Sequence, residues 1–373
     1  MDSALPSSAS VRVSSQSLVH ILGARVAVDL PTDSNDEDRC RTVRRALSEL
    51  VWCSYRAGIA PLGSSGMRTD AGWGCMLRAG QMLFANALVR HFGGSRAAAL
   101  RRVLPLFDDS VDDPLAAPFA VQQIARAGER YGTALGQWFG PQVLCAALRD
   151  LARDRDAVAD QLAVYLARDG VIYRDELEAA CGARRQSCLI LVPQRLGLNH
   201  VSHTYVAQIR RALESPYSCG IAGGRSNGAR FFCGLVSDPG RDDAVLYLDP
   251  HVVQATVAMR NAANFDDRSF HCDAPGSMAL HDIDPSVSFA FYCRDAVERE
   301  ALLASIGATI CRGTVDTFDA PAISVVSSLP DYLCEDAQDA PSRLMLFEDG
   351  EEEEKEKSGR SDMDDDDDDF AEL

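Results

Sequence analysis

The chain has 373 residues, of which 46% are hydrophobic, and its formal net charge is −18. This length suffices for a large buried core, and the acidic balance argues against a nucleic-acid-binding protein, which needs a basic face. The sequence contains no run of about 18 uninterrupted apolar residues, which argues against a membrane span. Its twelve cysteines, without a signal-peptide pattern, indicate a reducing compartment, so we expect a cytoplasmic protein.

The charge is distributed unevenly and suggests a division of the chain into three parts. Residues 348–373 hold fifteen acidic and three basic side chains, a net charge of −12. Such runs repel themselves and bury nothing. No proline- or serine-rich linker divides the middle of the chain. We therefore predict a flexible N-terminal segment (1–39), one compact domain (40–325) and a disordered acidic tail (326–373).

The periodicity of apolar residues changes along the compact domain. Helical spacing predicts helices at 41–51, 76–92, 121–131, 141–153 and 158–168. Short apolar runs bounded by turn signals predict strands at 188–192, 219–222, 229–236, 245–249 and 287–293. Helices followed by an antiparallel sheet define an α+β fold.

One cysteine stands where a glycine-rich loop meets a predicted helix. Gly72-Trp73-Gly74-Cys75 directly precedes the helical segment 76–92. Unpaired N–H groups and the helix dipole at such a terminus favour the thiolate, which is the nucleophilic form of cysteine. The alternative is that Cys75 is a small buried hydrophobe, as most cysteines in a core are.

A candidate base and a candidate acid follow a predicted strand. In Asp249-Pro250-His251 the acid and the histidine are two residues apart, so an extended backbone directs both to one face. A carboxylate there can hold an imidazole in one tautomer while the other ring nitrogen faces a thiol. The alternative is an ordinary turn at a strand end, with the histidine in water.

Other chemical signals are weak. His200 and His203 form a His-x-x-His pattern, but a metal site needs further ligands. The glycine-rich segment 223–228 matches neither a phosphate-binding loop nor a dinucleotide fingerprint. We therefore expect no metal and no cofactor.

Together these residues resemble the autophagin cysteine peptidases, papain-like enzymes that process the ubiquitin-like modifiers of autophagy. The similarity extends over roughly residues 50 to 310 and follows the same order along the chain. Its blocks lie at 54–56, 69–78, 80–82, 136–141, 193–197, 220–227, 247–251, 269–272 and 284–286.

The resemblance implies a fold and a set of roles. It implies a papain-like fold whose helical part carries the cysteine and packs on a sheet that carries the acid and the histidine. By motif position Cys75 is the nucleophile, Asp249 the orienting carboxylate and His251 the general base. Tyr55 corresponds to the tyrosine of the family's oxyanion hole.

The resemblance also implies control of access to the thiol. Trp138 corresponds to the tryptophan that covers the narrow cleft of the family. Gly223, Gly224 and Ser226 belong to the segment that corresponds to a mobile regulatory loop. Family members commonly carry proline where this chain has Ser226, so the loop is expected to close less rigidly. For Trp138 the alternative is a core aromatic before the helix that starts at Pro141.

The resemblance further implies substrates and partners. The expected substrates are a modifier precursor, cut after its C-terminal glycine, and the modifier conjugated to phosphatidylethanolamine, which brings the enzyme to a membrane surface. Asp364 to Asp369 lead into Phe370-Ala371-Glu372-Leu373. Phe370 and Leu373 match the short motif that adds a strand to the modifier and fills two apolar pockets. Two alternatives stay open: a cysteine hydrolase or acyltransferase with another amide substrate, and a modifier-binding protein with a weak active site.

Overall fold

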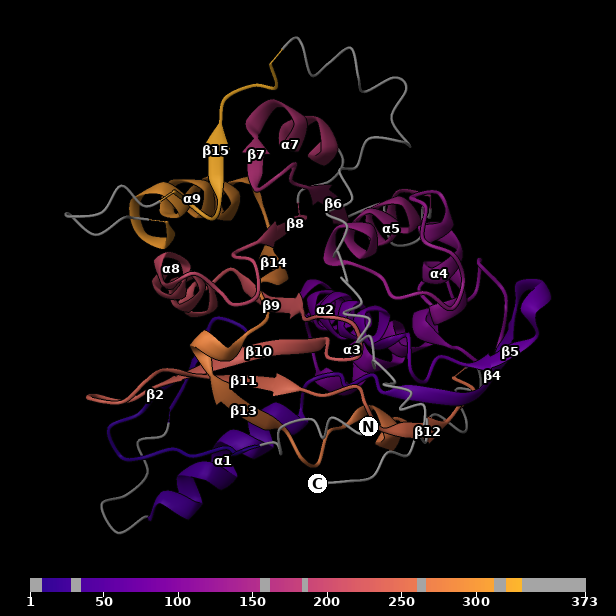
Figure 1. The fold of residues 1–373 in the computed structure, drawn as a ribbon, viewed down its shortest axis with the longest axis horizontal. Helices are drawn as coiled ribbons and strands as arrows, with labels where there is room; N and C mark the ends of the chain where they lie inside the picture. Colours follow the sequence, from indigo (N-terminus) through magenta and orange to yellow (C-terminus); the bar gives the residue numbers. More distant parts are fainter. Residues whose placement is uncertain are drawn as a thin grey trace, which may run out of the picture.

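The computed structural model describes residues 9–27, 35–154, 162–182, 187–259, 266–311 and 320–330. Within these residues helices pack on a large mixed sheet, so the predicted α+β class is confirmed (Figure 1). No helix of the described ranges is long and apolar enough to cross a membrane. The division of the chain into three parts stays a prediction, and Phe370 and Leu373 lie outside the described residues.

In the part of the chain that the structure describes, the central sheet contains ten strands. In chain order these are β1 (Ala9–Ser10), β2 (Leu18–Ile21), β3 (Ala24–Val26), β6 (Leu162–Leu166), β8 (Ser187–Arg195), β9 (Ser218–Gly223), β10 (Arg230–Ser237), β11 (Ala244–Leu248), β13 (Gly276–Ala279) and β14 (Ser286–Cys293). Their order in space is β1-β13-β11-β10-β9-β14-β8-β6, with β2 also pairing with β10, and β3 with β2. The sheet was expected to be antiparallel, but β6 and β8 are parallel, so it is mixed.

Two smaller sheets join distant segments. One has the order β12-β4-β5 and the other pairs β15 with β7. Their strands are β4 (Tyr55–Leu62), β5 (Met67–Thr69), β7 (Val171–Tyr173), β12 (Val253–Ala255) and β15 (Ser324–Val326). Because β12 and β4 are parallel neighbours, the chain just after His251 lies beside Tyr55.

Helices occupy both faces of the central sheet (Figure 1). The α-helices are α1 (Asp36–Ser48), α2 (Cys75–Phe92), α3 (Arg96–Val103), α4 (Val121–Glu129), α5 (Pro141–Arg153), α7 (Arg174–Cys181), α8 (His203–Glu214) and α9 (Ala296–Ser305). Short helical turns are η1 (Gly63–Ser65), η2 (Leu104–Phe107), η4 (Arg268–Phe270), η5 (Leu280–Asp282) and the π-helical η6 (Ile306–Ile310).

The strands between these helices are buried on both sides. In β8, Leu189 and Leu191 belong to the hydrophobic core shared with α1 to α5, whereas Ile190 and Val192 belong to the core shared with α7, α8 and α9. Alternate side chains of a strand point to opposite faces, so one apolar run supplies both cores. Helix α2, which begins at Cys75, lies in the first core.

One predicted helix is wrong. Within the segment predicted as helical at 158–168, residues 162–166 form strand β6. Leu162 and Leu166 pack in one core while Ala163 and Tyr165 pack in the other. A short apolar run that is buried on both faces has no single polar side, so periodicity alone does not separate strand from helix there. The five predicted strands and the other four helices are present, with ends that differ by up to a few residues.

Candidate active site

Helix α2 begins at Cys75, as predicted, and almost all of its length is buried. The loop before it is fixed by Asp70, whose main-chain carbonyl accepts hydrogen bonds from the N–H groups of Trp73 (3.3 Å) and Gly74 (2.8 Å). A Cβ atom at Gly74 would lie 2.7 Å from the Asp70 carboxylate, so only glycine fits. The sequence thus directs a tight loop into the helix and places the thiol at its first residue.

A buried ionic cluster supports this loop from behind. The Arg78 guanidinium donates to Asp70 at 2.7 and 2.9 Å and to Asp109 at 2.5 Å, and these side chains are at most 5% exposed. Asp70 also accepts the main-chain N–H of Arg56 at 2.8 Å. A cation with two anions is tolerated in a core only when its members are hydrogen-bonded. No sequence motif indicated this cluster, although charged residues around an apolar helix start are a signal for it.

Asp249 and His251 follow β11 and contact each other directly. The Nδ1 of His251 lies 2.5 Å from Oδ1 of Asp249, and the main-chain N–H of His251 donates to the same oxygen at 2.9 Å. Oδ2 accepts Nε–H of Arg230 at 3.0 Å. The Trp52 indole donates to the Asp249 carbonyl at 2.8 Å. The predicted acid–base contact therefore exists, and Arg230 and Trp52 are partners that the motif did not reveal.

The small sheet brings Tyr55 to this pair. The N–H of Tyr55 donates to the Pro250 carbonyl at 2.9 Å, and in the parallel pairing Val253 lies opposite Tyr55. The rings of Tyr55 and His251 meet edge to face, with centroids 5.5 Å apart and planes at 87°. The Tyr55 hydroxyl and Nε2 of His251 are both buried and both interact with Cys75, although neither contact has the geometry of a formed hydrogen bond. Such contacts are often loose before substrate binds.

The electrostatic setting distinguishes Cys75 from other cysteines. Burial disfavours its thiolate, but interactions with His251, the Ala229 N–H and Tyr55 outweigh this and lower the pKa of Cys75. By contrast, burial raises the pKa of Cys145 to about 12 and that of Cys219 to about 11. An inert core thiol behaves like the latter two.

The pKa values of the two partners in the acid–base pair shift in opposite directions. Burial lowers the pKa of His251, but Asp249 and Cys75 outweigh it and raise that pKa to about 9. Burial raises the pKa of Asp249, and its hydrogen bonds with His251 outweigh this effect and lower the pKa to about 2. Burial, with the nearby Cys75, raises the pKa of the Tyr55 hydroxyl. At neutral pH this arrangement can hold a thiolate beside an imidazolium, with a neutral phenol next to both.

The segment predicted as a regulatory loop connects β9 to β10 and reaches the thiol. Gly223 ends β9, Gly224 has φ +137°, and Ser226 is exposed at the tip. The segment then returns through the buried Ala229, whose main-chain N–H is one of the groups that lower the pKa of Cys75. This N–H is a further group that no sequence motif indicated.

Trp138 lies before α5 and is half-buried against the first core. Among the described residues its indole Nε1 is buried without a hydrogen-bond partner. The fully buried aromatic at this position is its neighbour Phe139. The structure joins Cys75, Tyr55, Asp249 and His251, whereas Trp138 is placed only against the core.

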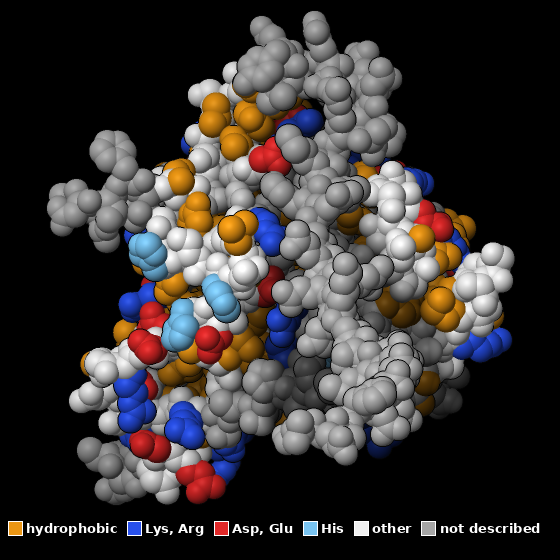
Figure 2. All heavy atoms as spheres, viewed as in Figure 1, with side chains coloured by type: hydrophobic (Ala, Val, Ile, Leu, Met, Phe, Trp, Pro, Cys, Tyr) orange, Lys and Arg blue, Asp and Glu red, His pale blue; other side chains and the backbone are white. Residues whose placement is uncertain are grey.

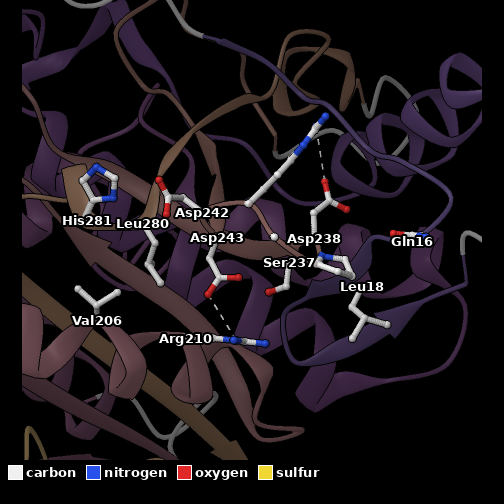
Figure 3. A pocket seen from close by; sticks show the side chains of 13 residues that line it. Gln16, Leu18, Val206, Arg210, Ser237, Asp238, Asp242, Asp243, Leu280 and His281 are labelled. Atoms are coloured by element: carbon white, nitrogen blue, oxygen red, sulfur yellow. Dashed lines mark ion pairs between the residues drawn. The ribbon is translucent and has the colours of Figure 1, made fainter.

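A separate cavity of about 490 Å³ lies at the other end of β10 and β11 (Figure 3). It is lined by the turn that includes Asp238 and Asp243, which pair with Arg241 (4.0 Å) and Arg210 (3.5 Å). Acidic, basic and histidine side chains intermingle over this part of the surface (Figure 2). Since β10 spans eight residues, this cavity is about 20 Å from the Asp249 end of the strands.

The histidines of the His-x-x-His pattern are exposed, with His203 as the first residue of α8. In the ranges that the structure describes, no three His, Cys, Asp or Glu side chains form a group able to hold a metal ion.

Known proteins resemble this chain over most of its length. Residues 40–305 match the family model of the peptidase C54 catalytic domain. Cysteine protease ATG4A of Xenopus laevis is 31% identical over 315 residues, which cover 74% of this chain and 75% of that protein. Cysteine protease ATG4B of Xenopus laevis is 32% identical over 350 residues, covering 82% and 86%. Cysteine protease ATG4A of Homo sapiens is 30% identical over 289 residues, covering 67% and 70%.

These matches confirm the family that the motifs indicated. The matched range includes the helix start at Cys75 and the Asp249–His251 pair. The chain therefore belongs to the peptidase C54 family and is an autophagy-related cysteine protease of the ATG4 type.

Proposed function

We propose that this protease cuts the amide bond after the C-terminal glycine of an autophagy ubiquitin-like modifier, using Cys75 as nucleophile within a papain-like fold. The observation that carries the proposal is the pair of His251 and Asp249, joined at 2.5 Å through Nδ1, which leaves the buried Nε2 of His251 without another partner among the described residues. His251 is also one of the groups that lower the pKa of Cys75. This is the arrangement by which a base and its orienting acid activate a thiol.

The attack forms a new bond between the Cys75 sulfur and the glycine carbonyl carbon. The oxyanion that develops is stabilised by the Cys75 N–H, which has no helical acceptor at the start of α2, and by the Tyr55 hydroxyl. The raised pKa of Tyr55 keeps its proton available for this bond. Both donors are held by secondary structure, α2 and β4, and need little reorganisation.

His251 then acts twice. As an imidazolium it protonates the leaving amine, which breaks the C–N bond and leaves a thioester on Cys75. As a neutral base it next takes a proton from water, whose oxygen attacks the thioester and releases the modifier. Asp249 keeps Nδ1 of the ring protonated throughout, so that Nε2 faces the thiol and the substrate.

Access to the thiol is controlled by the loop of Gly223 to Gly228. Cys75 is 0% exposed, and the Ala229 N–H at the base of this loop is one of the groups that stabilise its thiolate. A substrate tail must therefore displace part of this cover. Glycines tolerate such a movement, and the correspondence with the family assigns the flat indole of Trp138 to one wall of a slot suited to a thin glycine-ended tail.

Both proposed substrates carry the same bond type. One is the precursor, with residues beyond the glycine. The other is the modifier joined to phosphatidylethanolamine, so the enzyme contacts a membrane peripherally through its lipidated substrate. Release of the modifier from both forms supports autophagosome formation in the cytoplasm. Phe370 and Leu373 supply a second contact with the modifier.

The test is cleavage of a precursor extended beyond its glycine. Cys75→Ala is expected to abolish product formation, while Cys145→Ala, a change of another buried helical cysteine, leaves it largely intact. Retained cleavage by Cys75→Ala would overturn the assignment. A panel that includes ubiquitin precursors separates this proposal from a hydrolase or acyltransferase with another amide substrate. Modifier binding without cleavage would indicate a binding protein.

A further inference from the structure

We propose that Arg230 is a positioning residue that links the loop of Gly223 to Gly228 with Asp249. Through this link it holds the loop in place over Cys75. The proposal rests on the proposed function of Cys75, Asp249 and His251. It adds a residue that neither the motif nor the family match assigns.

The place of Arg230 follows from strand register. It is the first residue of β10 and lies at the base of the loop, opposite Gly223 of β9. On its other side, β10 pairs with β11 so that Phe231 faces Leu248. Continuing this antiparallel register by one residue sets Arg230 opposite Asp249. The residue that starts the loop-bearing strand therefore lies beside the acid.

Three contacts hold the guanidinium. Its Nε–H donates to Oδ2 of Asp249 at 3.0 Å, and Nη1 donates to the Gly228 carbonyl at 3.4 Å. Its central carbon lies 5.0 Å from the centroid of the Tyr247 ring. Arg230 is only 8% exposed, so each partner counts, because a buried cation must be paired.

A single peptide group connects Arg230 with the thiol. The carbonyl of Gly228 accepts a hydrogen bond from Arg230, and the N–H of the same peptide unit, on Ala229, is one of the groups that lower the pKa of Cys75. In a trans peptide these two groups point in opposite directions, so the peptide lies between the cation and the thiol. A cation on the carbonyl polarises the unit and strengthens its N–H as a donor.

Hydrogen bonds and electrostatic interactions therefore connect these groups in a ring that includes the Cys75 sulfur. From Cys75 the ring passes through the Gly228–Ala229 peptide to Arg230, then to Asp249, His251 and back to Cys75. The bond to the carboxylate is charge-assisted and short, whereas the bond to the neutral carbonyl is longer, so the second one breaks first when the loop is displaced. Arg230 thus stays with Asp249 and acts as the fixed point to which the loop returns.

The test measures the thiol and the loop without any modifier substrate. In Arg230→Met we expect the rate of Cys75 alkylation by iodoacetamide at neutral pH to fall about tenfold, the size of one lost hydrogen bond to a charged group. We also expect faster hydrogen exchange at the Ala229 amide. Arg241→Met, which removes an exposed arginine at the other end of β10 and β11, should change neither quantity.

Arg230→Lys keeps the test valid if the methionine variant does not fold. Lysine keeps the charge but has one nitrogen, so it cannot reach both Asp249 and Gly228 as the planar guanidinium of arginine does. We expect a melting temperature near that of the parent protein, with slower alkylation and faster Ala229 exchange. The proposal is overturned if folded variants alkylate and exchange like the parent, or if only the melting temperature falls. Because neither readout uses a modifier, such a result is distinct from a failure of Cys75→Ala to abolish cleavage.

Discussion

Tyr55 and His251 are 196 positions apart in the chain, yet their rings meet edge to face at 5.5 Å. The parallel pairing of β4 with β12 causes this meeting, since it ties the segment after His251 to the segment that starts at Tyr55. Tyr55 is therefore part of this small sheet, and His251 lies directly before it. A displacement of that sheet would move both groups together.

This arrangement predicts the effect of Tyr55→Phe. The ring stays and the sheet stays, but one oxyanion donor is lost, so we expect kcat for precursor cleavage to fall about 10²- to 10³-fold. Alkylation of Cys75 involves no oxyanion and should remain within a few-fold of the parent rate. Tyr165→Phe, which removes a buried hydroxyl bonded to the Tyr173 N–H, is the matched control and should retain kcat. Equal loss in both variants would argue against an oxyanion role.

The shifted pKa values predict how cleavage depends on pH. The pKa of His251 is raised to about 9, and that of Cys75 is lowered, so thiolate and imidazolium coexist at neutral pH. Above pH 9 the imidazolium loses the proton that the leaving amine needs, and kcat/KM should fall. Asp249→Asn removes the largest stabilisation of the imidazolium form of His251. The fall of kcat/KM at alkaline pH, the alkaline limb of the profile, should therefore move to lower pH. A limb that stays in place in Asp249→Asn would contradict the assignment of that limb to His251.

Part of this site could be predicted from sequence because its signals are local. A glycine-rich loop before a helical run predicts the position of Cys75, and an Asp-Pro-His end of a strand predicts one acid–base pair. Arg230, Trp52 and the Ala229 N–H could not be found this way. Each reaches the site through pairing between segments that are distant along the chain, and no spacing rule encodes strand order. Strand β6 was missed for a related reason, because its pairing with the distant strand β8 and its burial on both faces leave no periodic signal in the sequence.

The buried cluster behind α2 predicts a large effect on stability. Asp109→Ala would leave Arg78, which is 2% exposed, with one carboxylate fewer. We therefore expect the free energy of unfolding, measured in urea, to fall by about 3–5 kcal/mol. Asp112→Ala removes an aspartate from a partly exposed pair with Arg126 and should cost at most about 1 kcal/mol. If both variants lose a similar free energy of unfolding, burial of the cluster does not determine how much it contributes to stability.

The acidic tail predicts a separation of binding from chemistry. Deletion of residues 370–373 removes Phe370 and Leu373 but leaves Cys75, Asp249 and His251 in place. We expect weaker binding of the modifier or slower release from phosphatidylethanolamine, with cleavage of a soluble precursor largely intact. Substitution of Ala371 and Glu372 is the matched control, because neither supplies an apolar anchor. Unchanged affinity after the deletion would count against the motif.

A substitution at Ser226 tests whether the rigidity of this loop limits turnover. Gly228 N–H donates to the Arg225 carbonyl at 3.0 Å, and Asn227 between them has φ +57°. This is the pattern of a type II turn, with Ser226 at the second position, where proline is favoured. Ser226→Pro should therefore stabilise the turn by about 0.4–1 kcal/mol, mainly by restricting its alternatives.

If the loop must be displaced before a substrate tail reaches Cys75, that stabilisation opposes entry. We expect kcat/KM for the precursor to fall about two- to fivefold, the equivalent of the same free energy. Ser226→Ala changes the side chain without restricting the backbone and should retain the parent kcat/KM. The Ala229 amide should exchange more slowly in Ser226→Pro than in Ser226→Ala. Slower exchange with unchanged kcat/KM would mean that loop displacement does not limit entry, whereas a fall in both would identify the turn as the element that sets it.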